Sequence, residues 1–197
     1  MEMAVSLMCQ FTAEPGSIHR LIRKAKAGDV SSFEQIVMLY ERTVLRLARR
    51  LLLDPEMARD AAQEVFLRLH SKLGKFQEDR ALAPWLYRIT VNLCHDLQRR
   101  SKPSLVVALD FAESLRDSAL NPEQSVALLQ QQELVIAALK ELTPREREAI
   151  VLRDLEGLST AEVARVLRSS EGTVRSQIST GRVKIKRFVM AQLGRQA

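Results

Sequence analysis

Two closely spaced helix starts near the C-terminus constrain the fold of this chain most. The segments TPRE, residues 143–146, and STAE, residues 159–162, are capping boxes, in which a hydroxyl accepts from the third helical N–H and a glutamate reaches back to the cap. Gly157 ends the helix between them, and a tight turn near Ser169 precedes another helix. A compact domain of short helices is therefore predicted here.

The last predicted helix, residues 169–188, is rich in basic residues. A short capped helix, a turn and a longer basic helix form the helix-turn-helix pattern, whose second helix enters the major groove. Basic helix ends also complement the helix dipole, but the capping boxes make that the weaker interpretation. The predicted buried stripe of this helix consists of Val174, Ile178, Ile185 and Phe188. The helical period then turns another set outward, where it is available to base edges and phosphates: Arg175, Ser176, Ser179, Thr180 and Val183. The remaining basic residues suit the sugar-phosphate backbone of DNA: Arg182, Lys184, Lys186 and Arg187.

Helix signals also fill the first half of the chain, so the predicted fold class is all-α. The second helix carries an apolar stripe from Phe33 to Leu51, the third begins with Asp54 as cap before Pro55, and the fourth begins at Pro84. An aromatic share of 5% and only seven glycines argue against a strand-rich sandwich.

Residues 101–123 interrupt the helical pattern with two prolines, scattered serines and more acids than bases. They are predicted to be a linker between two small helical domains, residues 18–100 and 124–197, with an N-terminal tail at residues 1–17. The C-terminal domain is predicted to be a four-helix helix-turn-helix domain whose first helix starts at Asn121.

The charge and the cysteines limit the partners and the compartment. A net charge of +6 favours an anionic partner, although an acidic protein surface or a membrane would satisfy it as well as nucleic acid. Cys9 and Cys94 match no disulfide or redox pattern, which favours reduced thiols. Glu2 stands where a signal peptide carries Lys or Arg, and no window approaches the roughly 18 apolar residues of a membrane span. A cytoplasmic protein is expected.

Two polar faces stand out in the first half. One side of the fourth helix carries Trp85, Arg88, Asn92 and Arg99. An aromatic ring, an amide and two cations on one face suit single-stranded nucleic acid. The alternative is that Trp85 packs in the core, as a lone Trp at a helix start more often does. In DAAQEVF, residues 60–66, two acids one turn apart make an acidic patch, which is also compatible with ordinary solvated surface.

From residue 18 to residue 189 the chain resembles bacterial RNA polymerase sigma factors of the extracytoplasmic-function (ECF) class. Four segments carry the resemblance in the order and approximate spacing of that family: GDVSSFEQIVMLY, DAAQEVFLRLH, PWLYRITVN and LTPREREAIVLRDLEGLSTAEVARVLRSSEGTVRS. The resemblance implies a dissociable subunit that binds core RNA polymerase and recognises and melts promoter DNA, with no catalysis and no cofactor.

The same resemblance assigns roles to residues. It implies that the third helix docks on the clamp helices of the largest polymerase subunit, that the loop of residues 76–82 and the fourth helix open the minus-ten element and hold a flipped base, and that the last helix reads the minus-thirty-five element. The implied residues are Asp60, Gln63, Glu64 and Phe66 for polymerase, Phe76, Trp85, Arg88, Asn92 and Arg99 for the minus-ten element, and Thr173, Arg175, Ser176, Ser179, Thr180, Arg182 and Lys186 for the minus-thirty-five element.

The resemblance further implies an anti-sigma partner, often membrane-bound. It does not extend to promoter preference, because Gln177 and Thr180 stand where family members often have arginine, and Leu82 stands where they have an aromatic residue.

Two alternatives come from other classes. The segment from residue 142 to 174 also resembles the output domain of LuxR-type operator-binding regulators, but such a regulator has no need for the segments at residues 60–66 and 84–92. An enzyme is less favoured, because His19, His70 and His95 form no metal-spaced cluster and no glycine-rich phosphate loop is present.

Overall fold

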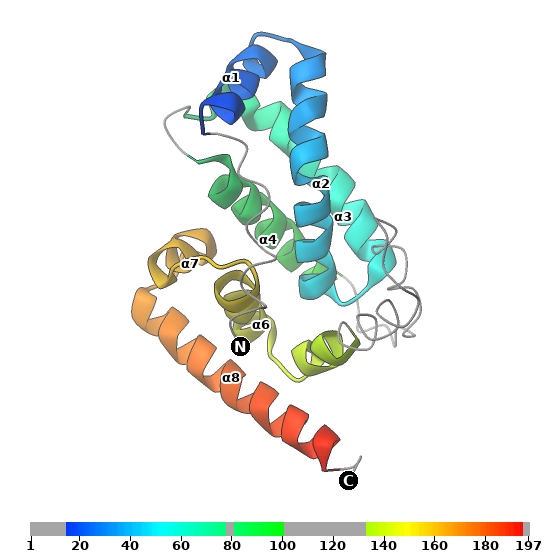
Figure 1. Cartoon of the computed structure of the whole chain (residues 1–197), viewed down its shortest axis with the longest axis vertical. Helices are drawn as coiled ribbons and strands as arrows, with labels where there is room; N and C mark the ends of the chain where they lie inside the picture. Colours follow the sequence, from blue (N-terminus) through cyan, green and yellow to red (C-terminus); the bar gives the residue numbers. More distant parts are fainter. Residues whose placement is uncertain (1–14, 78–80, 101–132, 195–197) are drawn as a thin grey trace.

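The computed structural model describes residues 15–77, 81–100 and 133–194, and its regular elements are helical, which confirms the predicted all-α class (Figure 1). The N-terminal bundle comprises α1 (Pro15–Lys26), α2 (Val30–Leu52), α3 (Pro55–Lys72), the 3-10 turn η2 (Leu73–Lys75) and α4 (Leu82–Arg100). The C-terminal bundle comprises a helical segment at residues 133–140, α6 (Pro144–Ile150), the π-helical turn η4 (Val151–Leu155), α7 (Thr160–Leu167) and α8 (Glu171–Leu193). The predicted linker, the first fourteen residues of the tail and the predicted helix start at Asn121 lie outside the described residues.

The helices begin where short polar side chains satisfy free backbone N–H groups. Asp54 accepts from the N–H of Met57 at 3.0 Å and starts α3. Both predicted capping boxes form, with Thr143 and Glu146 at the start of α6 and with Ser159 and its glutamate partner at the start of α7. These contacts, readable in the sequence, fix where the C-terminal helices start.

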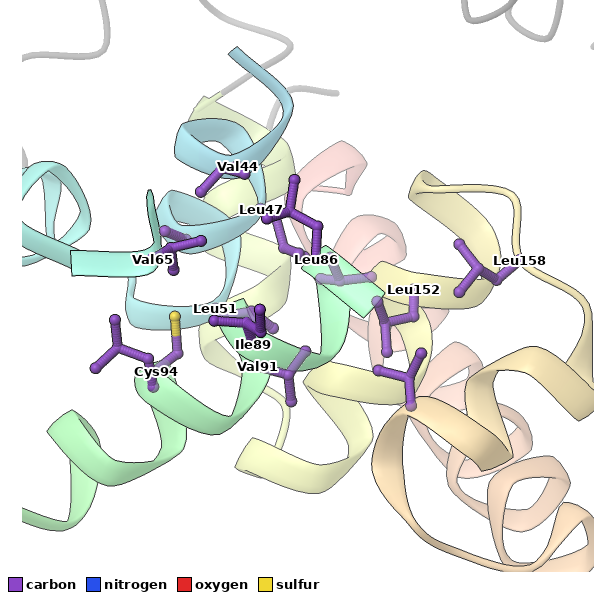
Figure 2. Close-up of a cluster of buried hydrophobic side chains, with 14 of the residues drawn as sticks. Val44, Leu47, Leu51, Val65, Leu86, Ile89, Val91, Cys94, Leu152 and Leu158 are labelled. Atoms are coloured by element: carbon purple, nitrogen blue, oxygen red, sulfur yellow. The ribbon is translucent and has the colours of Figure 1, made fainter. Parts of the chain in front are cut away.

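The predicted apolar stripes form the interior of the N-terminal bundle. Leu47 of α2, Val65 of α3 and Leu86 of α4 are fully buried, and Ile89 is 7% exposed. Figure 2 shows them converging between the three helices. At about 25 cal/mol per Å² of buried apolar surface, such side chains are the main stabilising contribution to a helical bundle.

A second buried face of α4 packs against the C-terminal bundle. Val91 and Cys94 point away from the predicted leucine stripe yet are only 3% and 2% exposed. They belong to the same apolar cluster as Leu152 of η4 and Leu158 before α7 (Figure 2). Burial raises the pKa of the Cys94 thiol to about 12, so the side chain behaves as a small apolar residue. Helix α4 therefore lies between the other helices of its own bundle and the C-terminal bundle.

None of the helices in the described ranges has the combination of length and apolarity that a membrane crossing requires.

Helix α8 lies close to α6 because glycine occupies the point of contact. A Cβ added at Gly181 would meet Ile150 Cγ1 at 2.8 Å, which is closer than real Cβ contacts. Val174 and Ile178 extend the same buried side of α8 toward its N-terminus, as predicted. The orientation of the whole helix therefore depends on the absence of a side chain at one position.

We expect Gly181→Val to lower the free energy of unfolding by about 1–3 kcal/mol, because the added methyl groups overpack the α6–α8 contact. Urea unfolding followed by circular dichroism measures the change. Gly172→Ala is the matched control, since its Cβ would meet only Ser170 Oγ at 3.8 Å, and it should cause no loss. An unchanged unfolding midpoint in Gly181→Val would show that α8 can shift at no cost.

Candidate nucleic-acid interface

A narrow polar stripe runs along α4. Trp85, Arg88, Asn92 and Arg99 fall within about 60° of the helix circumference at 100° per residue. Asn92 and Arg99 are exposed, whereas Trp85 and Arg88 are half-buried. One aromatic ring, one amide and two cations therefore share a single accessible line on the surface.

The ring of Phe76 does not belong to this accessible stripe. Phe76 is only 6% exposed, and its ring lies 4.8 Å from that of Trp85, centroid to centroid, at an interplanar angle of 34°. Lys26 Nζ also donates to the Phe76 carbonyl at 3.1 Å, which fixes the segment that precedes α4. Phe76 is therefore buried in this structure and supports Trp85, and its contact with DNA stays a prediction. The core interpretation of Trp85 is right in part, because one side of its ring packs inward.

The exposed face of α8 presents five of the seven residues that the family resemblance assigns to the minus-thirty-five element. Thr173, Arg175, Ser176, Ser179 and Thr180 are all exposed and span about 160° of the helix, opposite the buried side. This side of the helix-turn-helix is therefore open to a DNA groove.

Local contacts at the start of α8 orient this face. Arg168 ends α7 in the left-handed conformation, at φ 51°, and makes the turn between the two helices tight. Ser170 Oγ accepts from the Thr173 N–H at 3.0 Å, and Arg175 Nη2 lies 2.6 Å from Glu171 Oε2. This exposed ion pair contributes little stability and can be exchanged for a contact to DNA.

Arg182 lies at the edge of this face, and Lys186 lies within its angular range nearer the C-terminal end of the helix. Arg182 makes a two-pronged ion pair with Asp154, at 2.9 and 2.6 Å, and both basic residues line an apolar groove between α8 and η4. In this structure the guanidinium of Arg182 therefore holds the two elements together, and its contact with DNA phosphate stays a prediction. Lys186 is exposed at the edge of the same groove.

A third face lies on α3. Asp60 and Gln63 are exposed and Glu64 is partly exposed, with its carboxylate 2.7 Å from Arg68 Nε. Phe66 is 9% exposed and packs in the core, where it supports the α3 face, and its contact with polymerase stays a prediction. Sequence reasoning missed Leu67, which is 67% exposed in the middle of this face. Leu67 follows Glu64, Gln63 and Asp60 by three, four and seven residues, and this helical spacing could have placed it on the same face.

No three His, Cys, Asp or Glu side chains within the described ranges are placed to hold a metal ion together.

The chain matches two family models that follow each other along the sequence. Residues 36–103 match Sigma-70 region 2, and residues 132–185 match Sigma-70, region 4. The first covers α4 and most of α2, and the second covers the helix-turn-helix.

Curated relatives align over most of the chain. It is 35% identical over 163 residues to the ECF RNA polymerase sigma factor SigM of Mycobacterium tuberculosis, with 83% of this chain and 80% of that protein covered. It is 34% identical over 182 residues to the RNA polymerase sigma-H factor of Pseudomonas aeruginosa, with 88% and 94% covered. Among solved structures, CnrH in complex with the cytosolic domain of CnrY is similar at a TM-score of 0.66 and 26% identity, with 88% and 97% covered.

A helix-turn-helix with an open face, joined to a second helical bundle with its own polar stripe, defines an all-helical DNA-binding protein. The two region matches and the relatives narrow that class, and the chain belongs to the ECF RNA polymerase sigma factors. It is a sigma subunit that directs promoter-specific transcription. The LuxR-type alternative is not favoured, because the region 2 match covers the half of the chain that such a regulator does not need.

We expect Asn92→Ala to impair promoter opening while leaving both polymerase binding and the free energy of unfolding unchanged, because Asn92 is exposed on the α4 stripe. Trp85→Ala should impair opening and also lower stability, by at least about 1 kcal/mol, because it removes the ring packed on Phe76. Permanganate reactivity of unpaired thymines measures opening. Equal losses of opening and polymerase binding in Asn92→Ala would mean that the stripe is only solvated surface.

Proposed function

We propose that this sigma factor divides its work among three surfaces: α3 docks on core RNA polymerase, the α4 stripe engages the melted minus-ten element, and α8 reads the minus-thirty-five element. The observation that carries the proposal is the open face of α8, where five polar side chains predicted from the sequence are all exposed beside a capped helix start. The chain supplies binding and positioning in this scheme and no catalytic chemistry.

The α3 face suits a basic protein surface. Asp60 and Glu64 place two carboxylates one turn apart on a chain whose net charge is +6, and the clamp helices implied by the family resemblance would complement them. Leu67 adds an exposed apolar side chain between these polar groups. An apolar centre with a polar rim is the usual composition of a protein interface.

The α4 stripe suits an unpaired strand. Bases stack on aromatic rings, amides bond base edges and cations hold phosphates, and α4 offers one ring, one amide and two cations in a line. A flipped base needs a pocket with an aromatic wall, which the exposed side of Trp85 could supply. Phe76 behind that ring would keep it from turning away.

The α8 face suits duplex DNA. Arg175 can contact guanine, and the hydroxyls of Ser176, Ser179 and Thr180 can donate or accept at either kind of base pair. The free N–H groups at the start of α8 add a partial positive charge that favours a nearby phosphate.

We further propose an anti-sigma partner and a cytoplasmic site of action. The similar structures were determined with partners bound: CnrH with the cytosolic domain of CnrY, and the sigma factor RpoE of Bartonella quintana with the anti-sigma factor NepR. The latter is 21% identical to this chain, so it supports the fold alone. The partner argument comes from CnrH and from the family as a whole.

Reversing both charges, in Asp60→Lys/Glu64→Lys, should abolish binding to core RNA polymerase while leaving helicity intact, because a basic α3 face would repel a basic partner. Fluorescence anisotropy of the labelled chain titrated with core enzyme measures the affinity. Asp60→Glu/Glu64→Asp is the matched control, since it keeps both charges, and it should retain most of the affinity. Undiminished binding of the lysine variant would remove α3 from the interface.

A promoter library transcribed by core polymerase plus this chain should yield promoter-specific transcripts that need the added protein. In the same assay, Arg175→Ala should relax selection at one minus-thirty-five position by about 1–3 kcal/mol, whereas Lys186→Ala should weaken all promoters evenly and reduce the salt slope by about one. The reverse pattern would mean that Lys186 faces the bases. No transcripts, together with tight binding of the free chain to a duplex operator, would favour the regulator alternative.

A further inference from the structure

Helix α8 carries a single acidic residue, Glu171, at its first position. Two other helices of this bundle also have a glutamate in the first turn, and there the backbone uses the carboxylate. Glu146 and Glu162 accept from the N–H of the residue that caps their helix, at 2.9 and 2.8 Å. In α8 the cap is Ser170, whose hydroxyl accepts from the Thr173 N–H at 3.0 Å. The Glu171 carboxylate therefore takes no part in capping its helix.

The Glu171 carboxylate instead contacts the arginine proposed to read guanine. Arg175 Nη2 lies 2.6 Å from Glu171 Oε2, and the two side chains are 66% and 47% exposed. The other oxygen, Glu171 Oε1, accepts no hydrogen bond from the parts of the chain that the structure describes. An exposed pair of this kind contributes little to stability. It leaves a carboxylate oxygen and most of the guanidinium N–H groups available to a ligand.

The pair lies at the end of α8 that approaches DNA. The N-terminal residues of a recognition helix are the ones that contact base edges. Glu171 lies about 40° from Arg175 around the helix, so it borders the α8 face. Gly172, the next residue, has no side chain to keep DNA away, and a Cβ added there would meet only Ser170 Oγ, at 3.8 Å. A base edge can therefore come close to the Glu171 carboxylate.

A carboxylate in this position discriminates between bases. DNA is anionic, so an acid beside it opposes binding unless the carboxylate accepts a hydrogen bond from a base. In the major groove cytosine presents an amino donor, whereas guanine and thymine present acceptors that would repel a carboxylate. Adenine is less suitable than cytosine, because its N7 acceptor lies beside its amino group. Glu171 would therefore favour cytosine.

We propose that Glu171 is a specificity-determining residue of the minus-thirty-five contact, and that it accepts from the amino group of a cytosine in the base pair next to the guanine read by Arg175. The contacting atoms of the two side chains are 2.6 Å apart, and stacked base pairs are about 3.4 Å apart, so the pair can address neighbouring base pairs. This inference rests on the proposed function, because it assumes that α8 reads the minus-thirty-five element.

A promoter library with a randomised minus-thirty-five element, transcribed by core polymerase and the full chain, measures the base preference at each position. Glu171→Gln should lose at least about fivefold of the selection for cytosine at one position and gain selection for adenine there, because glutamine pairs with adenine N6 and N7. Glu171→Ala should lose the cytosine preference and gain no other. Glu141→Gln removes the same charge from an exposed residue outside α8, so it is the control and should leave the preferences unchanged.

A cytosine analogue that lacks the 4-amino group tests the contact itself. At the position that Glu171→Gln identifies, the analogue should lower transcription by the parent chain at least about fivefold and leave transcription by Glu171→Ala unchanged. An equal effect of the analogue on both chains would show that another residue reads the amino group.

Three other results would overturn the inference. They are unchanged preferences in Glu171→Gln, a uniform gain on all promoters, and a change confined to the position that Arg175→Ala affects, which would mean that Glu171 only orients Arg175. If the parent chain shows no minus-thirty-five preference, or if Arg175→Ala alters none, the proposed function of α8 fails as well. A parent preference that depends on Arg175 but not on Glu171 would contradict this inference alone.

Discussion

The guanidinium of Arg147 connects the parts of this structure that the backbone alone leaves separate. Its three acceptors are carbonyls near the ends of two helices, groups that have no partner within their own helix. A buried arginine without acceptors would be strongly unfavourable, and buried carbonyls without donors would each cost about 1–3 kcal/mol. The position of α6 against α2 is therefore determined by mutual satisfaction of polar groups, and the apolar cluster around Val91 and Leu152 fills the space that this contact defines.

This arrangement explains why α4 is buried on two sides and open on a third. One side packs in the N-terminal bundle, and the side carrying Val91 and Cys94 packs against the C-terminal bundle. The line from Trp85 to Arg99 stays accessible, so the α4 stripe, the α3 face and the α8 face all lie at the surface of this structure.

Local sequence signals predicted most of the fold, because caps and apolar periodicity act within a few residues. Thr143 and Ser159 cap the predicted helices, and Val174 and Ile178 are buried while their polar neighbours are exposed. The signals failed where a distant segment decides the environment. Val91 looks like an outward residue until the C-terminal bundle covers it, Phe76 is buried by its contact with Trp85, and Arg182 turns to Asp154, which is 28 residues away in sequence. Phe66 lies at the edge of the buried side of α3, where periodicity alone does not separate core from surface.

The two proposed DNA contacts, on α4 and on α8, belong to different bundles. Two weak DNA contacts reinforce each other only when their separation matches the spacing of the sites. Polymerase bound at the α3 face would fix that separation, so promoter recognition would depend on the presence of the enzyme.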